Sequence, residues 1–77
     1  MMSQNEMILR HLQEFGKITP MEAIENYGCM RLSARISELR EKGMRAGFDI
    51  ETKMVKSKNR FGADVSYAEY NYKENRA

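Results

Sequence analysis

The feature that most constrains the fold is the close spacing of two helical segments, which are separated by little more than Gly28. Ahead of this glycine, Thr19 and Glu22 form a capping box with Pro20 at the first helical position, so a helix is predicted over residues 20–27. Glycine readily adopts the left-handed conformation that ends a helix, and Gly28 is expected to end this one.

A second helix is predicted to follow almost at once, over residues 30–42. Leu32, Ile36 and Leu39 fall at i, i+4 and i+7, which places them on one face, and Gly43 is expected to end the helix. The turn between the two helices offers no Ser or Thr cap. Two helices joined this tightly must cross at a large angle, which is the geometry of a helix-turn-helix unit.

An amphipathic helix is also predicted ahead of this unit, over residues 4–15. Ser3 and Glu6 form a capping box at its start, and Gly16 supplies its left-handed end. The residues expected to face the core from the three helices are Ile8, Leu12, Phe15, Ala23, Ile24, Tyr27, Leu32, Ile36 and Leu39.

After the third helix the pattern changes from helical to alternating. Strand-forming residues alternate with polar ones over residues 48–56 and recur over residues 64–73, where Tyr70 and Tyr72 share one face. The segment 57–64 is rich in turn formers, so the two strands are predicted to form an antiparallel hairpin.

The 77 residues are predicted to form one α+β domain, residues 1–77, with three helices followed by the hairpin. A chain of this length buries too little surface for a deep catalytic pocket. No nucleophile–base pair, metal-ligand cluster or phosphate-binding loop is visible, so we expect neither an enzyme nor a cofactor. The polar tail from Lys73 to Ala77 is expected to fray.

The helix-turn-helix segment also carries a family resemblance. The sequence T-P-M-E-A-I-E-N-Y-G, followed by R-L-S-A-R-I-S-E-L-R-E-K-G, resembles the helix-turn-helix of small phage and prophage winged-helix proteins. The resemblance covers residues 4–73. It implies a winged helix-turn-helix fold, with the third helix presented to the major groove of double-stranded DNA and the hairpin, or wing, set against the flanking backbone or minor groove.

The distribution of charge favours a nucleic-acid partner more than the net charge of +2 suggests. Residues 29–60 carry nine basic and four acidic side chains, net +5, whereas residues 1–28 are net −2 and residues 61–77 are net −1. The wing is therefore expected to be a concentrated positive projection, which suits backbone phosphates. Its basic residues, which have no acidic neighbour between residues 52 and 63, are Lys53, Lys56, Lys58 and Arg60.

The face of the third helix opposite the core provides the candidates for reading bases. Ala34 lies at its centre, where a small side chain lets the helix backbone approach a groove. Arg31 or Arg35 could donate two hydrogen bonds to guanine, and Glu38 could accept one from the amino group of cytosine. The candidate DNA-binding residues are Met30, Arg31, Ser33, Ala34, Arg35, Glu38, Lys53, Lys56, Lys58 and Arg60.

Other residues that could carry chemistry have more ordinary interpretations. His11 has no second histidine or neighbouring carboxylate pair, so it is interpreted as a surface or boundary residue and not as a metal ligand. Cys29 is expected to pack between the second and third helices, and the seven methionines are interpreted as core filler. A single cysteine, with no secretory signal and no apolar run of about 18 residues, predicts a cytoplasmic protein without a membrane span.

Two functions remain open. The main hypothesis is a double-stranded DNA-binding protein of phage or mobile-element type, with a regulatory or architectural role. The alternative is a small module that binds a host protein through the same scaffold. A continuous basic face would favour DNA, whereas interruption of that face by acidic residues would favour the interaction module. The residues of that face are Arg31, Arg35, Lys56, Lys58 and Arg60. Both a monomer and a homodimer are compatible with the sequence, which has no heptad repeat.

Overall fold

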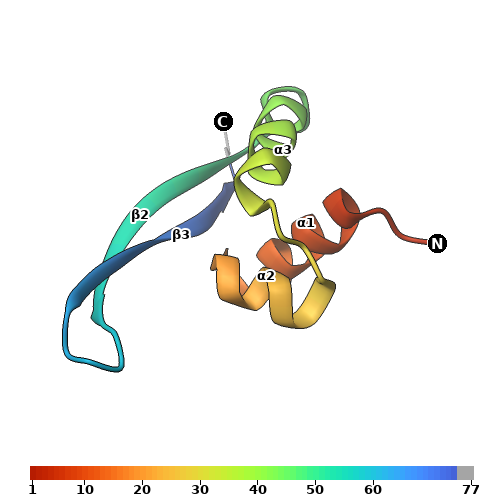
Figure 1. Ribbon diagram of the computed structural model, residues 1–77. Helices are drawn as coiled ribbons and strands as arrows, with labels where there is room; N and C mark the ends of the chain where they lie inside the picture. Colours follow the sequence, from red (N-terminus) through yellow and green to blue (C-terminus); the bar gives the residue numbers. More distant parts are fainter. Residues whose placement is uncertain (75–77) are drawn as a thin grey trace.

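The computed structural model of this chain describes residues 1–74. It contains the three predicted helices and the predicted hairpin of an α+β domain, together with one short additional strand. The helices form a body from which the hairpin projects as a long curved arm (Figure 1). The elements in chain order are α1 (Gln4–Phe15), β1 (Lys17–Ile18), α2 (Pro20–Tyr27), α3 (Leu32–Ala46), β2 (Phe48–Lys58) and β3 (Asp64–Glu74).

The first two helices begin and end at the predicted residues because their local signals act as expected. The capping boxes at Ser3 and Thr19 are both formed, with the side chain of each accepting a hydrogen bond from a backbone N–H three residues later. Gly16 and Gly28 end the helices with φ of 84° and 64°, in the left-handed region. Local capping chemistry therefore sets the ends of both helices.

The start of α3 differs from the prediction by two residues. The helix begins at Leu32 and not at residue 30, so the turn contains four residues, Gly28 to Arg31. The turn is longer because the side chain of Cys29 is buried between the helices, 1% exposed, and its N–H donates to the carbonyl of Ala23. Arg31 is the N-cap and makes no side-chain capping bond, in agreement with the predicted absence of a Ser or Thr cap.

The prediction that Gly43 ends α3 is wrong. The helix continues to Ala46, and Gly47, with φ of 86°, provides the left-handed end. Gly43 is instead buried, and a Cβ atom placed on it would overlap the carbonyl oxygen of Phe48 and lie 2.9 Å from two carbons of the Phe48 ring. The absence of a side chain at Gly43 therefore allows the chain to turn from α3 into β2.

The sheet has three antiparallel strands in the order β1-β3-β2. Strands β2 and β3 pair along their whole length, from Phe48 with Glu74 to Lys58 with Asp64, somewhat beyond the predicted ends. The short strand β1 was not predicted, since two residues are too few to show an alternating pattern. Residues 75–77 of the tail that was expected to fray lie outside the described residues. The first two residues of that tail, Lys73 and Glu74, belong to β3.

The core lies where α1, α2 and α3 meet the base of the hairpin, and most residues predicted to fill it do so. Phe15 and Ile24 are exceptions, since they are 63% and 41% exposed. The interpretation of the methionines as core filler is also wrong, because branched aliphatic and aromatic residues already fill this small interior. The exposed methionines are Met1, Met2, Met21, Met30, Met44 and Met54. The core residues are Ile8, Leu12, Ile18, Ala23, Cys29, Leu32, Ile36, Leu39, Phe48, Ile50 and Tyr70.

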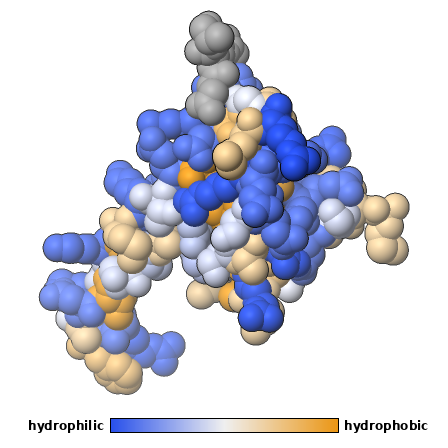
Figure 2. All heavy atoms as spheres, turned by 90° about the horizontal axis from the view of Figure 1, so that it is seen from above, coloured by the Kyte–Doolittle hydropathy of each residue, from blue (hydrophilic) through white to orange (hydrophobic). Residues whose placement is uncertain are grey.

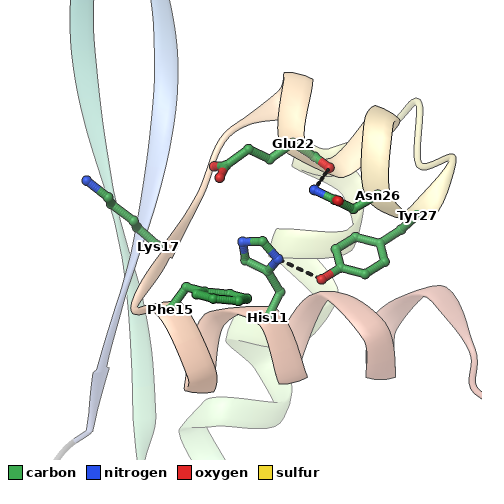
Figure 3. A pocket seen from close by; sticks show the side chains of 6 residues that line it. All are labelled: His11, Phe15, Lys17, Glu22, Asn26 and Tyr27. Atoms are coloured by element: carbon green, nitrogen blue, oxygen red, sulfur yellow. Dashed lines mark hydrogen bonds between the residues drawn. The ribbon is translucent and has the colours of Figure 1, made fainter.

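His11 is buried, only 6% exposed, and is not the surface or boundary residue that was predicted. Its Nδ1 lies 2.6 Å from the hydroxyl oxygen of Tyr27, which joins α1 to α2, and the Phe15 ring lies against the imidazole at 4.7 Å between centroids (Figure 3). Burial, with the carboxylates of Glu14 and Glu22 nearby, raises the pKa of the Tyr27 hydroxyl above its ordinary value. The pair lets α1 pack on α2 with a polar contact inside the interface.

The Gly43→Ala variant tests the close approach of α3 to β2. In a helix interior this change ordinarily stabilises by about 1 kcal/mol. Here we expect it to lower the free energy of unfolding by about 1–3 kcal/mol, because the added methyl overlaps Phe48. Urea denaturation measures the effect, with Ser37→Ala at an exposed position of the same helix as the control. A Gly43→Ala protein more stable than the parent would contradict this packing.

Candidate nucleic-acid interface

The start of α3 is where a helix-turn-helix unit meets a groove, and several predicted site residues lie there. Met30 is 80% exposed and Arg31 is exposed, but both belong to the turn before the helix and not to the helix itself. In the first turn of α3, Ser33 is exposed but Ala34 is half-buried, so Ala34 is not the exposed centre of the outer face that was predicted. Glu38, one turn later on the same side of the helix, contacts Asn5 of α1. The structure therefore assembles four of the candidates at one end of α3.

Arg35 and Glu38 lie on the side of α3 that faces α1, and they are engaged with each other. A nitrogen of the Arg35 guanidinium is 2.6 Å from a carboxylate oxygen of Glu38. Glu38 also accepts a hydrogen bond from the side-chain amide of Asn5 on α1, at 3.4 Å. These contacts neutralise much of both charges, so neither side chain presents an isolated charge to a partner.

The opposite side of α3 faces the wing, and there the structure identifies a residue that was not among the candidates. The Nε atom of Arg40 donates to the carbonyl of Ile50 at 2.8 Å, and its Nη2 donates to the Thr52 hydroxyl at 2.6 Å. The guanidinium also lies 6.0 Å from the centroid of the Tyr70 ring. Arg40 thus ties α3 to β2 and fixes the angle of the wing. Its helical position alone could not reveal this role, since the acceptors are ten or more residues away.

The basic residues of the wing do not share one face. Side chains alternate along a strand, so Lys56 and Lys58 lie on the face of the hairpin that packs against α3 at its base, and Lys53 lies on the other face. Lys53 is directly opposite Glu69 in the register of β2 and β3. The predicted clustering of all four basic residues is therefore only partly present.

The wing is also less positive than the linear sequence indicated. The ammonium of Lys58 is 2.8 Å from a carboxylate oxygen of Asp64, its partner across the hairpin. Both side chains are largely exposed, so the attraction between them is weak, but Asp64 still offsets the positive charge locally. Lys56 and Arg60 are exposed and form no ion pair within residues 1–74, so they carry the positive charge of the outer wing.

A surface hollow lies beside His11. It has a volume of about 440 Å³ and is lined by side chains of α1, the β1 strand and α2 (Figure 3). Across residues 1–74, no group of three or more His, Cys, Asp or Glu side chains is placed to hold a metal ion. In the same part of the chain, no helix has the length and apolar character needed to span a membrane.

The geometry of α2, the turn, α3 and the paired wing agrees with a comparison to known families. Residues 3–74 match the family model described as a winged helix-turn-helix domain, and the chain belongs to this family. Domains of this class are in general DNA-binding modules and are typically not enzymes. No curated protein and no solved structure matches the chain.

An Arg40→Gln variant tests whether this side chain fixes the wing. We expect the free energy of unfolding to fall by about 1.5–3 kcal/mol, because two hydrogen bonds from a charged donor are lost. Chemical denaturation measures the loss. Arg45→Gln is the matched control, since Arg45 is an exposed arginine of the same helix with no ion pair among the described residues, and a change within about 0.5 kcal/mol is expected there. Equal effects of the two substitutions would contradict the role of Arg40.

Proposed function

We propose that this protein binds double-stranded DNA, with the start of α3 in the major groove and the wing along the flanking backbone. The observation that carries the proposal is that Arg40 holds the basic wing beside α3, so that helix and wing can meet one duplex together. The role is regulatory or architectural, of the kind found in phage and mobile elements, and involves no catalysis.

Arg31 is the residue best suited to read a base. It is exposed, lies at the N-cap of α3, and has no ion-pair partner among residues 1–74. An exposed guanidinium at the start of a recognition helix can donate two hydrogen bonds to the O6 and N7 atoms of guanine. Arg35 reaches a base only by giving up its ion pair with Glu38, so its contribution to affinity is smaller.

The remaining candidates have two roles: some allow α3 to approach the groove closely, and others add affinity for the DNA backbone. Ser33 and the small side chain of Ala34 allow the backbone of α3 to come close to the groove. Lys56 and Arg60 supply phosphate contacts from the outer wing, whereas Lys58 shares its charge with Asp64. Because a single domain presents a single α3, a homodimer would read two half-sites and a monomer only one.

A host-protein interaction module is the second candidate, and a specific observation favours it. Acidic residues interrupt the basic face, since Glu38 pairs with Arg35 and Asp64 pairs with Lys58. Exposed methionines also lie at both ends of α3: Met30, just before the helix, is 80% exposed and Met44, in its last turn, is 85% exposed. Flexible apolar side chains of this type suit a protein surface that adapts to a partner.

Salt-dependent binding to duplex DNA tests the main proposal. We expect Lys56→Ala to weaken binding to all sequences and to reduce the slope of log affinity against log salt by about one unit, because one phosphate contact is lost. Lys73→Ala is the control, since the Lys73 ammonium is 3.0 Å from Glu51 at the other end of the hairpin. Fluorescence anisotropy with a mixed-sequence duplex at several salt concentrations measures both slopes. Absence of binding to any duplex at low salt would remove the proposal and favour the interaction module.

The base-reading role of Arg31 has a separate signature. On a duplex selected from a random pool, Arg31→Ala should cost about 1–3 kcal/mol of binding free energy and relax the preference at one base pair. Arg10→Ala, which removes the same charge at an exposed position on α1, is the control for a general loss of positive charge. A uniform loss of affinity across all sequences would show that Arg31 contacts only the backbone.

A further inference from the structure

The tip of the wing carries an aromatic side chain where a solvent-exposed turn ordinarily carries polar ones. Phe61 is 89% exposed, and its neighbours in the turn, Arg60 and Gly62, are exposed as well. The far end of the projecting arm presents apolar atoms bordered by hydrophilic ones (Figure 2). Exposed in this way, the Phe61 ring contributes little to the folding of the domain.

The turn that holds Phe61 is well ordered by its own hydrogen bonds. The side-chain oxygen of Asn59 accepts from the backbone N–H of Phe61 at 2.9 Å and from that of Ala63 at 3.0 Å. The N–H of Asn59 donates to the carbonyl of Ala63, and Gly62 adopts the left-handed conformation with φ of 79°. A ring presented on such a turn loses little conformational freedom when it inserts between other groups.

The length of the arm sets how far this ring can reach from α3. Thr52 is the outermost residue tied to Arg40, and the six residues from there to Lys58 extend about 20 Å at about 3.4 Å each. Half of a B-DNA helical turn, the offset from a major groove to the neighbouring minor groove, is about 17 Å. An arm of this length is long enough to span from a major groove that holds α3 to the adjacent minor groove.

We propose that Phe61 is a wedge that inserts between base pairs from the minor groove and partly unstacks them. This inference rests on the proposed DNA binding and adds a mode of recognition to it. Apolar side chains inserted from the minor groove kink duplexes, and such insertion is easiest at pyrimidine–purine steps such as TA, which unstack readily. Arg60, the chain neighbour of Phe61, places positive charge at the tip, and Lys56 adds a second charge on the outer part of β2; both can contact the phosphates that flank the groove.

The test uses the whole protein and two duplexes of equal length, one rich in TA steps with 2-aminopurine replacing one adenine, and one built from stiff A-tracts. We expect the parent protein to prefer the TA-rich duplex and to raise the 2-aminopurine fluorescence as the labelled base unstacks. Phe61→Ala should lose the fluorescence rise and on the order of tenfold affinity for the TA-rich duplex, with little change on the A-tract duplex.

Two further variants separate a wedge from a general loss of apolar surface. Phe61→Leu keeps a large apolar side chain and should retain most of the fluorescence rise. Phe15→Ala removes another exposed phenylalanine, 63% exposed at the end of α1, and should behave as the parent does. Because Phe61 contributes little to the core, circular dichroism should report an unchanged fold for its variants.

The outcomes distinguish failure of the wedge from failure of DNA binding. If the parent protein binds neither duplex, the proposed function fails and the wedge fails with it. If both duplexes are bound and Phe61→Ala changes neither the preference nor the fluorescence, DNA binding stands, the wedge is overturned and the ring is left for contact with a protein. An equal loss of affinity on both duplexes also overturns the wedge, because insertion of the ring depends on how readily the base-pair step unstacks.

Discussion

The arrangement of helix and wing depends on one close contact between α3 and the start of β2. The bare Cα of Gly43 lies against Phe48, which lets the chain leave the helix and return beside it. One turn earlier in the helix, Arg40 bonds to Ile50 and Thr52 and prevents the hairpin from swinging away from α3. Both contacts lie at the base of the wing. The function proposed for its tip, up to about 20 Å further along the strands, therefore depends on two residues that are not among the proposed DNA contacts.

Local chemistry explains which parts of the fold could be predicted. Helices α1 and α2 were placed correctly because their capping residues and terminal glycines act within four residues of themselves. The end of α3 was misplaced because glycine has two uses, as a left-handed cap and as a position without a side chain, and only the folded partner Phe48 distinguishes them at Gly43. Strand β1 was not predicted because only its pairing with β3, and not its two-residue sequence, identifies it as a strand.

The candidate site was harder to predict because the partner of a charged side chain is set by its neighbours in the folded structure and not by its neighbours in the sequence. Asp64 follows the basic segment in the sequence but lies directly across the hairpin from Lys58. Arg35 and Glu38 were assigned separate bases, although residues three apart on a helix are within reach of each other. Arg40 was not among the candidates because its acceptors, on Ile50 and Thr52, lie ten or more residues away in the sequence. The candidate DNA-binding surface is therefore smaller than predicted and comprises the start of α3, Lys56 and Arg60. The exposed ring of Phe61 lies beyond them.

If α3 and the wing meet one duplex as a unit, titration of the isotopically labelled protein with a mixed-sequence duplex will show both in contact with it. Backbone amide chemical shifts report contact residue by residue. We expect changes in the turn and first part of α3, residues 30–35, and in the outer wing, residues 56–62, that progress together as DNA is added, with little change around His11 and Tyr27. Changes confined to α1 and α2, or absent at low salt, would contradict this mode of binding.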